Sequence, residues 1–175
     1  EAPDVNTNDT LKTGTWRVLA DGHTSTLRLQ TEGTSPESIV TIANNASVVL
    51  DAMNGGTAKF DELGPLTTLA GALYLIGDVV HSMSTNGVAV SGTIGGDGVI
   101  SNDVDLLDGG TITPGQSVGV LTLVGNHSIG ADGSAVTYQW EPGDRIDVSG
   151  NLEMGPNATA TPPTLEILDL GDGGA

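Results

Sequence analysis

The stretch from Gly110 to Asn126 constrains the fold more than any other part of this chain. It reads G-T-I-T-P-G-Q-S-V-G-V-L-T-L-V-G-N, with a short β-branched run, a Pro-Gly turn, an alternating strand and a Gly-Asn turn. Short runs of this kind bounded by turn residues are typical of β-strands joined by tight corners. A chain that turns every few residues favours a stacked β-coil over a globular enzyme domain.

The same organisation extends along the rest of the sequence. Apolar runs recur about every 8–14 residues, which is an all-β signal. Residues 61–82 place leucines at helical spacing, but Gly71 and Gly77 bracket Ala72–Ile76 and favour a strand there. The principal predicted strands are Leu27–Leu29, Ile39–Ile42, Ser47–Leu50, Thr57–Phe60, Leu73–Ile76, Val88–Val90, Val120–Val124, Val136–Trp140, Arg145–Val148 and Leu165–Leu168.

Composition distinguishes between all-β architectures. The chain has 26 glycines but only two Trp, two Tyr and one Phe, so small aliphatic residues must fill the interior. Thin stacked layers suit such an interior better than a wide sandwich, although Asn54-Gly55 and Asn86-Gly87 leave hairpins possible. Turns of about 20 residues predict a β-solenoid of roughly eight short coils. We expect one solenoid domain over residues 1–170, with 171–175 as a tail or the start of a linker.

Asparagine and glycine mark several predicted corners of the solenoid. The pairs Ser101-Asn102, Gly125-Asn126 and Gly150-Asn151 each end a strand-like run. Asparagine tolerates the left-handed backbone that a corner requires. Stacked Asn side chains can also form hydrogen bonds along the solenoid axis. We therefore expect these positions to join successive coils.

Charge and cysteine content exclude several classes of protein. The net charge is −17, from 22 acidic against five basic residues, which argues against nucleic-acid binding. The absence of cysteine excludes disulfides and thiolate metal sites. Gly and Asp residues interrupt the longest apolar segment, Leu63–Val80, so we expect no insertion into a membrane.

Residues 110–152 carry a more specific pattern. They contain Gly110-Thr111, Pro114–Gly119, Leu121–Leu123 followed by Gly125-Asn126, Gly133-Ser134, and Asp144–Gly150 before Leu152. In this order and spacing, the segment resembles the passenger-associated repeat of bacterial autotransporters and related surface β-helix proteins. The resemblance implies a right-handed parallel β-helix in an extracellular or cell-surface bacterial protein.

The expected function is that of a non-enzymatic structural or adhesin-type segment within a larger exported protein. Its partners would be surface glycans or other extracellular proteins. A carbohydrate-binding module is the alternative, with Trp16, Tyr138 and Trp140 as the candidate stacking platform. A polysaccharide-degrading β-helix is a third possibility, which would use Asp103 and Asp105 as paired carboxylates.

The densest acidic cluster is S-N-D-V-D-L-L-D-G-G, which contains Asp103, Asp105 and Asp108. Hard oxygen ligands beside flexible glycines suit calcium, so these three aspartates form a candidate calcium site. Otherwise no cofactor is expected. Strand alternation predicts that Asp103 and Asp105 face solvent while Val104 and Leu106 point inward.

The remaining ionisable candidates favour structural roles. His23, His81 and His127 are isolated in sequence and lack the spacing of a metal site, so we expect them in turns or at the surface. Asp144-Arg145 is interpreted as a charge-assisted pair that fixes a corner.

Overall fold

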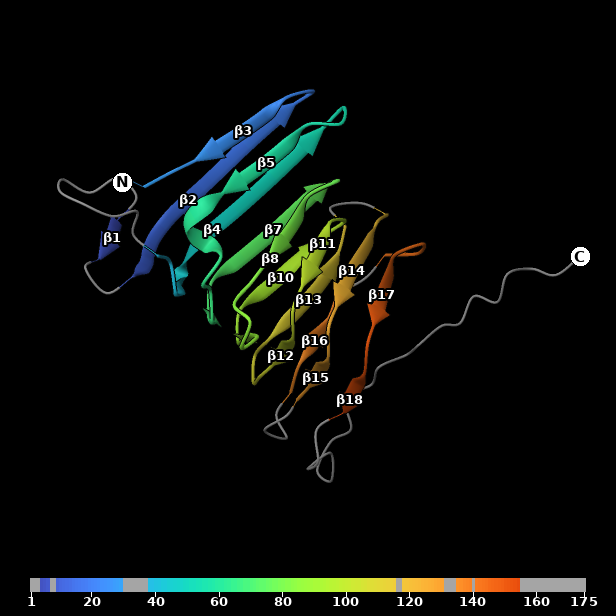
Figure 1. The fold of residues 1–175 in the computed structure, drawn as a ribbon. Helices are drawn as coiled ribbons and strands as arrows, with labels where there is room; N and C mark the ends of the chain where they lie inside the picture. Colours follow the sequence, from blue (N-terminus) through green and yellow to red (C-terminus); the bar gives the residue numbers. More distant parts are fainter. Residues whose placement is uncertain are drawn as a thin grey trace, which may run out of the picture.

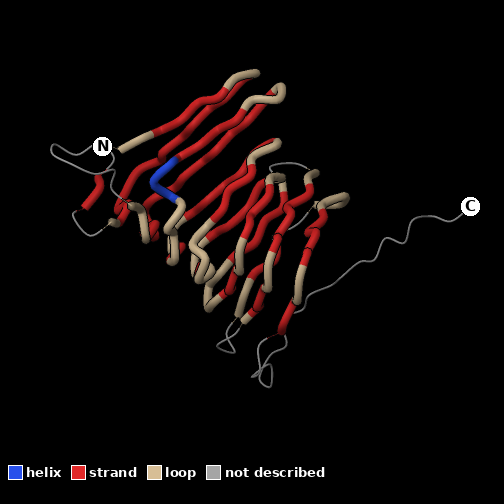
Figure 2. Tube along the Cα trace, in the orientation of Figure 1, coloured by secondary structure: helices blue, strands red, loops and turns tan. Residues whose placement is uncertain are grey.

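The computed structural model describes residues 4–6, 9–29, 38–115, 118–130, 135–139 and 141–154. Over these residues the chain is built from β-strands, and one short 3-10 turn, η1 (Asp61–Leu63), is the only helical segment. Figures 1 and 2 show the strands side by side, following the chain from the N-terminal end to β17 and β18. The predicted all-β class is confirmed. No helix in the described part has the length and apolar character needed to cross a bilayer.

The described strands form three sheets. The 12-stranded sheet contains β1 (Asp4–Asn6), β2 (Thr10–Asp21), β4 (Thr41–Met53), β6 (Thr68–Leu69), β7 (Ala72–Gly77), β9 (Val88–Val90), β10 (Thr93–Gly96), β12 (Val104–Leu106), β13 (Thr111–Pro114), β15 (His127–Ile129), β16 (Thr137–Tyr138) and β18 (Leu152–Met154). The four-stranded sheet contains β8 (Val80–Ser82), β11 (Val99–Ser101), β14 (Val120–Val124) and β17 (Arg145–Ser149). The two-stranded sheet contains β3 (Thr24–Leu27) and β5 (Thr57–Phe60).

Strand pairing is parallel for every pair of named strands except β1 with β2. From β6 onward the chain forms strands in sets of three, and each strand pairs with its equivalent in the next set. The repeat length varies. Val88 pairs with Val104, 16 residues later, whereas Thr10 pairs with Thr41, 31 residues later. The predicted 20-residue turn lies within this range.

Inward side chains form columns that run across the stacked strands. One column follows the register of six neighbouring strands and consists of Trp16, Val48, Leu73, Ile94, Ile112 and Tyr138. Its four aliphatic members are all buried, with at most 5% of each residue exposed. Burying a side chain of this size contributes about 1.5–3 kcal/mol. The narrow aliphatic interior expected from composition is therefore present.

Glycine is the last residue of β7 and of β10 and the first residue after β13. Gly77, Gly96 and Gly115 all have positive φ, of 73°, 104° and 73°. A Cβ atom on Gly96 would lie 1.8 Å from the carbonyl oxygen of Leu75 in the preceding set of strands. This corner requires glycine for two reasons. Its backbone is left-handed, and the neighbouring strand approaches too closely for a Cβ atom.

The N-terminal strands differ from the prediction. β2 was not anticipated, and β4 is one strand of 13 residues where Ile39–Ile42 and Ser47–Leu50 were predicted separately. The polar residues Asn44 and Asn45 lie exposed on β4 where its register with β2 shifts and its other partner changes from β6 to β7. The strand expected at Ala72–Ile76 is confirmed as β7. The predicted strand Leu165–Leu168 lies outside the described residues.

Candidate functional site

The acidic cluster lies on and beside β12. Asp105 is exposed at the centre of this strand, while its neighbours Val104 and Leu106 are buried, as the alternation predicts. Asp103 is half-buried at the corner before the strand, and Asp108 is exposed in the turn after it.

Two of these three carboxylates bind the next set of strands. Asp103 Oδ1 accepts a hydrogen bond of 2.7 Å from the backbone N–H of Asn126, and Asp105 Oδ1 accepts one of 2.6 Å from the Ser128 hydroxyl. Both bonds run from β12 toward β15, with which it pairs. Within the described ranges, no three His, Asp or Glu side chains are grouped to hold a metal ion. Calcium binding by Asp103, Asp105 and Asp108 stays a prediction.

Asp103 begins a ladder of hydrogen bonds along one corner. The side-chain oxygen of Asn126 accepts a bond of 3.3 Å from the backbone N–H of Asn151, just as Asp103 accepts one from Asn126. Each corner residue therefore binds its equivalent in the following set of strands. The expected bond between asparagine corners is present between Asn126 and Asn151, whereas Asp103 instead of Asn102 takes this role before β12.

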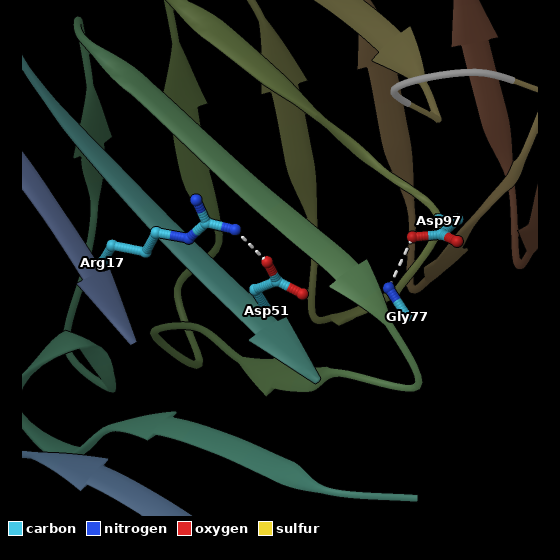
Figure 3. Close-up of polar contacts among 4 residues, drawn as sticks. All are labelled: Arg17, Asp51, Gly77 and Asp97. Atoms are coloured by element: carbon cyan, nitrogen blue, oxygen red, sulfur yellow. Dashed lines mark hydrogen bonds and ion pairs between the residues drawn. The ribbon is translucent and has the colours of Figure 1, made fainter. Parts of the chain in front are cut away.

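The same use of carboxylates recurs elsewhere. Asp97 Oδ1 accepts a hydrogen bond of 2.6 Å from the backbone N–H of Gly77 (Figure 3). Arg17 on β2 reaches across to Asp51 on β4, whose side chain is only 6% exposed (Figure 3). A buried carboxylate needs such a partner, because an unpaired charge is costly inside a protein.

The predicted pair Asp144-Arg145 needs correction. Arg145 instead forms a two-pronged ion pair with Asp147, with Nε–Oδ1 and Nη2–Oδ2 distances of 2.7 and 2.8 Å. Asp144 accepts hydrogen bonds from the backbone N–H groups of Gly119 and Glu141, at 2.9 and 2.6 Å. Residues two apart share one face of a strand, which places Arg145 beside Asp147. Asp144 does fix a corner, but through backbone groups.

Two of the three histidines are buried, contrary to the prediction. His23 is exposed, whereas His81 and His127 are only 8% and 2% exposed. They occupy inward positions in their strands, where His81 is paired with Ile100 and His127 with Val104. Isolated histidines carry no sequence signal of burial, but the alternation of their strands places them in the core.

Burial changes the acid–base properties of both rings. It lowers the pKa of His81 to about 4, with a smaller opposing effect from a hydrogen bond to the backbone of Leu63. Burial also lowers the pKa of His127, opposed by the Leu123 backbone and by the carboxylates of Asp103 and Asp105. Within the described part, His81 Nε2 and both ring nitrogens of His127 have no hydrogen-bond partner of normal geometry. Burial therefore favours the neutral form of both rings.

The two described members of the proposed aromatic platform, Trp16 and Tyr138, lie apart. Trp16 and Tyr138 occupy opposite ends of the same interior column, and the Trp16 ring packs 6.2 Å from that of Phe60. Both side chains are partly buried against the core. Trp140 lies outside the described residues. Trp16 and Tyr138 cover the ends of the column instead of forming one surface.

An outward aromatic residue was missed by the sequence analysis. Tyr74 lies between the buried residues Leu73 and Leu75 on β7, so its ring is on the outer face of the sheet, where the residue is partly buried. Its cross-strand neighbour on β10 is Gly95, where a Cβ atom would lie 3.3 Å from the Tyr74 ring and 2.5 Å from Thr113. The alternation Leu-Tyr-Leu was the available signal.

Comparison with protein-family models, curated proteins and solved structures gives no match.

The corner ladder leads to a test at Asp103. We expect Asp103→Ala to destabilise the protein by about 1.5–3 kcal/mol, because it removes a charged acceptor from the Asn126 N–H. Asp108→Ala is the matched control, since Asp108 is exposed, and should change stability by less than about 0.5 kcal/mol. Urea unfolding of the two variants measures the difference, and equal effects would contradict a structural role for Asp103.

Calcium binding to the same aspartates has its own test. If Asp103, Asp105 and Asp108 bind calcium, the protein should melt at a higher temperature in about 1 mM calcium than in a chelator. The reason is that a ligand that binds only the folded state stabilises it by mass action. The rise should disappear in Asp105→Asn and Asp108→Asn variants. An identical melting temperature with calcium and with chelator ends the calcium hypothesis.

Proposed function

We propose that the chain is a right-handed parallel β-helix of roughly eight coils. The parallel pairing of equivalent strands supports a continuously winding chain. The right-handed sense rests on the resemblance of residues 110–152 and on the strong preference of parallel crossover connections for that hand. Interior columns such as Val48–Leu73–Ile94 supply the continuous core that a solenoid needs.

On this scaffold, the protein serves as a non-enzymatic structural or adhesin-type segment of an exported bacterial protein, displayed extracellularly or at the cell surface. The observation that carries this proposal is the use of Asp103 and Asp105, the best candidates for chemistry. Their carboxylates accept hydrogen bonds from Asn126 and Ser128 of the next set of strands. The two carboxylates thus hold neighbouring sets of strands together. This use favours a structural role for the protein over a catalytic one.

Surface display is tested with antibodies raised against the 175-residue chain. They should label intact cells of the producing organism, or detect the protein in its medium. Labelling that requires permeabilised cells would contradict surface display. The non-enzymatic assignment is tested by incubation with a panel of polysaccharides, which should yield no new reducing ends. Cleavage that Asp105→Asn abolishes would overturn it.

A carbohydrate-binding module is the second candidate, and Tyr74 is the observation that favours it. Its partly buried side chain lies on the outer face beside Gly95 of β10, with Thr93 on the same strand and Thr113 one strand further, on β13. An aromatic ring flanked by hydroxyl groups can stack on a sugar and form hydrogen bonds to it. Glycan-array binding that Tyr74→Ala removes without loss of the fold would support this function. Binding that survives the substitution would place the ligand elsewhere.

A further inference from the structure

A group of six outward residues on the large sheet contains no charged side chain, although the net charge of the protein is −17. They lie on β7, β10 and β13, which are neighbours in the sheet (Figure 1). All of them except Gly95 are partly exposed. They form the uncharged face, which consists of one row with Ala72, Thr93 and Thr111 and a second row with Tyr74, Gly95 and Thr113.

Charged residues occupy outward positions elsewhere on the stack. One such row contains Asp105 on β12, Ser128 on β15 and Glu153 on β18. Arg145 and Asp147 form their ion pair on β17. The uncharged face therefore suits a ligand that is itself uncharged. The net charge of the protein would repel an acidic ligand, and a basic ligand would find no carboxylate among the six residues.

Gly95 allows an aromatic ring and a methyl group to come together on this face. A Cβ atom at Gly95 would lie 3.3 Å from Tyr74 Cδ1 and 2.5 Å from Thr113 Cγ2. The two side chains therefore lean over this glycine from the strands on either side of it. Together the Tyr74 ring and the Thr113 methyl group form an apolar surface on which the C–H groups of a sugar ring can stack.

Hydroxyl groups repeat beside this apolar surface. Thr93 and Thr111 are register partners on β10 and β13, and Thr137 continues their row on β16. Because neighbouring strands lie about 4.7–4.9 Å apart, the row offers a hydroxyl group at each strand along this direction. A chain of sugar residues that lies across the strands can therefore stack one ring on Tyr74 and form hydrogen bonds to successive threonines. A few polar groups beside an apolar surface are typical of ligand sites.

We propose that the uncharged face binds a linear, uncharged polysaccharide that lies across β7, β10 and β13. The inference rests on the carbohydrate-binding function proposed as the second candidate, and it adds the class of ligand and its orientation. Tyr74 and Thr113 supply the stacking surface, while Thr93 and Thr111 supply hydrogen-bonding groups. Acidic polysaccharides are excluded by charge, because no basic residue on this face offsets the net charge of −17.

Native electrophoresis through gels that contain a polysaccharide tests this proposal, because binding slows the migration of the protein. Hydroxyethyl cellulose, galactomannan and dextran are the uncharged probes. Carboxymethyl cellulose and dextran sulfate are their acidic counterparts on the same backbones as the first and third, and glycol chitosan is a basic probe. At least one uncharged polymer should slow the 175-residue chain, and its acidic counterpart should not.

Substitutions on the face locate the site. Tyr74→Ala should weaken binding of the uncharged polymer by about tenfold, whereas Tyr74→Phe keeps the ring and should retain most of the affinity. Thr111→Val removes a hydroxyl group but keeps the β-branched shape, so the fold should persist while binding weakens several-fold. Thr122→Val is the matched control, since Thr122 is a partly exposed threonine on β14 of the four-stranded sheet, and it should bind like the native protein. Circular dichroism checks the fold of each variant.

Three results would overturn the proposal. Retardation by charged polymers alone, lost in Tyr74→Ala, would refute the uncharged ligand and leave a carbohydrate-binding function in place. Equal binding of an uncharged polymer by the native protein, Tyr74→Ala and Thr111→Val would place the site on another face. Retardation by none of the polymers would overturn both this proposal and the carbohydrate-binding function.

Discussion

Gly96→Ala is expected to destabilise the protein by about 4 kcal/mol or more, or to prevent folding, which is at the upper end for a single substitution. The backbone φ of Gly96 is +104°, a conformation that an L-residue adopts only under strain. The added Cβ would also lie 1.8 Å from the Leu75 carbonyl oxygen, so the two strands would have to separate. Thermal and urea unfolding, followed by circular dichroism, measure the loss.

Gly64→Ala is the matched control for this substitution. Gly64 has an ordinary helical φ of −51°, and the nearest atom to its added Cβ is the Asp61 oxygen at 3.9 Å. We expect a change of less than about 1 kcal/mol in either direction. If Gly96→Ala and Gly64→Ala unfold at the same urea concentration, that result would contradict the close approach of Gly96 to the Leu75 carbonyl.

The second large effect is acid sensitivity from His81. Its folded-state pKa of about 4 lies below the ordinary value of 6.5, so the unfolded chain binds the proton more strongly. The free energy of unfolding therefore keeps its full value, as far as His81 is concerned, above pH 6.5. It decreases progressively as the pH falls toward 4. At 1.36 kcal/mol per pH unit, the loss amounts to about 3 kcal/mol. Below pH 4 this residue makes no further difference.

His81→Leu isolates that contribution, because leucine is apolar and suits a column that continues through Ile100. The variant's stability relative to the native protein should rise by about 3 kcal/mol between pH 7 and pH 4. His23→Leu is the matched control, because it makes the same substitution at an exposed histidine. Parallel pH profiles for the native protein and His81→Leu would contradict the burial of this ring.

Local patterns were sufficient to predict much of the fold. Bracketing by Gly71 and Gly77 identified β7, and the alternation around Val104 and Leu106 placed Asp105 outward. The long strand β2 was missed because its outward positions hold Lys12, Arg17 and Asp21, which leave no continuous apolar run. Its extended conformation depends on pairing with β4, a contact between residues about 30 apart that no local window contains.

The candidate site shows the same limit. Sequence spacing grouped Asp103, Asp105 and Asp108, but it could not reveal that Asn126 and Ser128 lie within hydrogen-bonding distance in the next set of strands. Trp16 and Tyr138 were grouped by residue type, whereas the register places them at opposite ends of one column. Residue type identified the candidates, and only the stacking order determined their neighbours.

A residue-resolved NMR map of contacts between strands tests the parallel stack most directly. Ile94 should give amide-to-Hα cross-peaks that place it between Leu73 and Ile112, and Leu121 should be linked in the same way to Ile146. Strong Hα–Hα cross-peaks between these strands, which antiparallel pairing produces, would contradict the account.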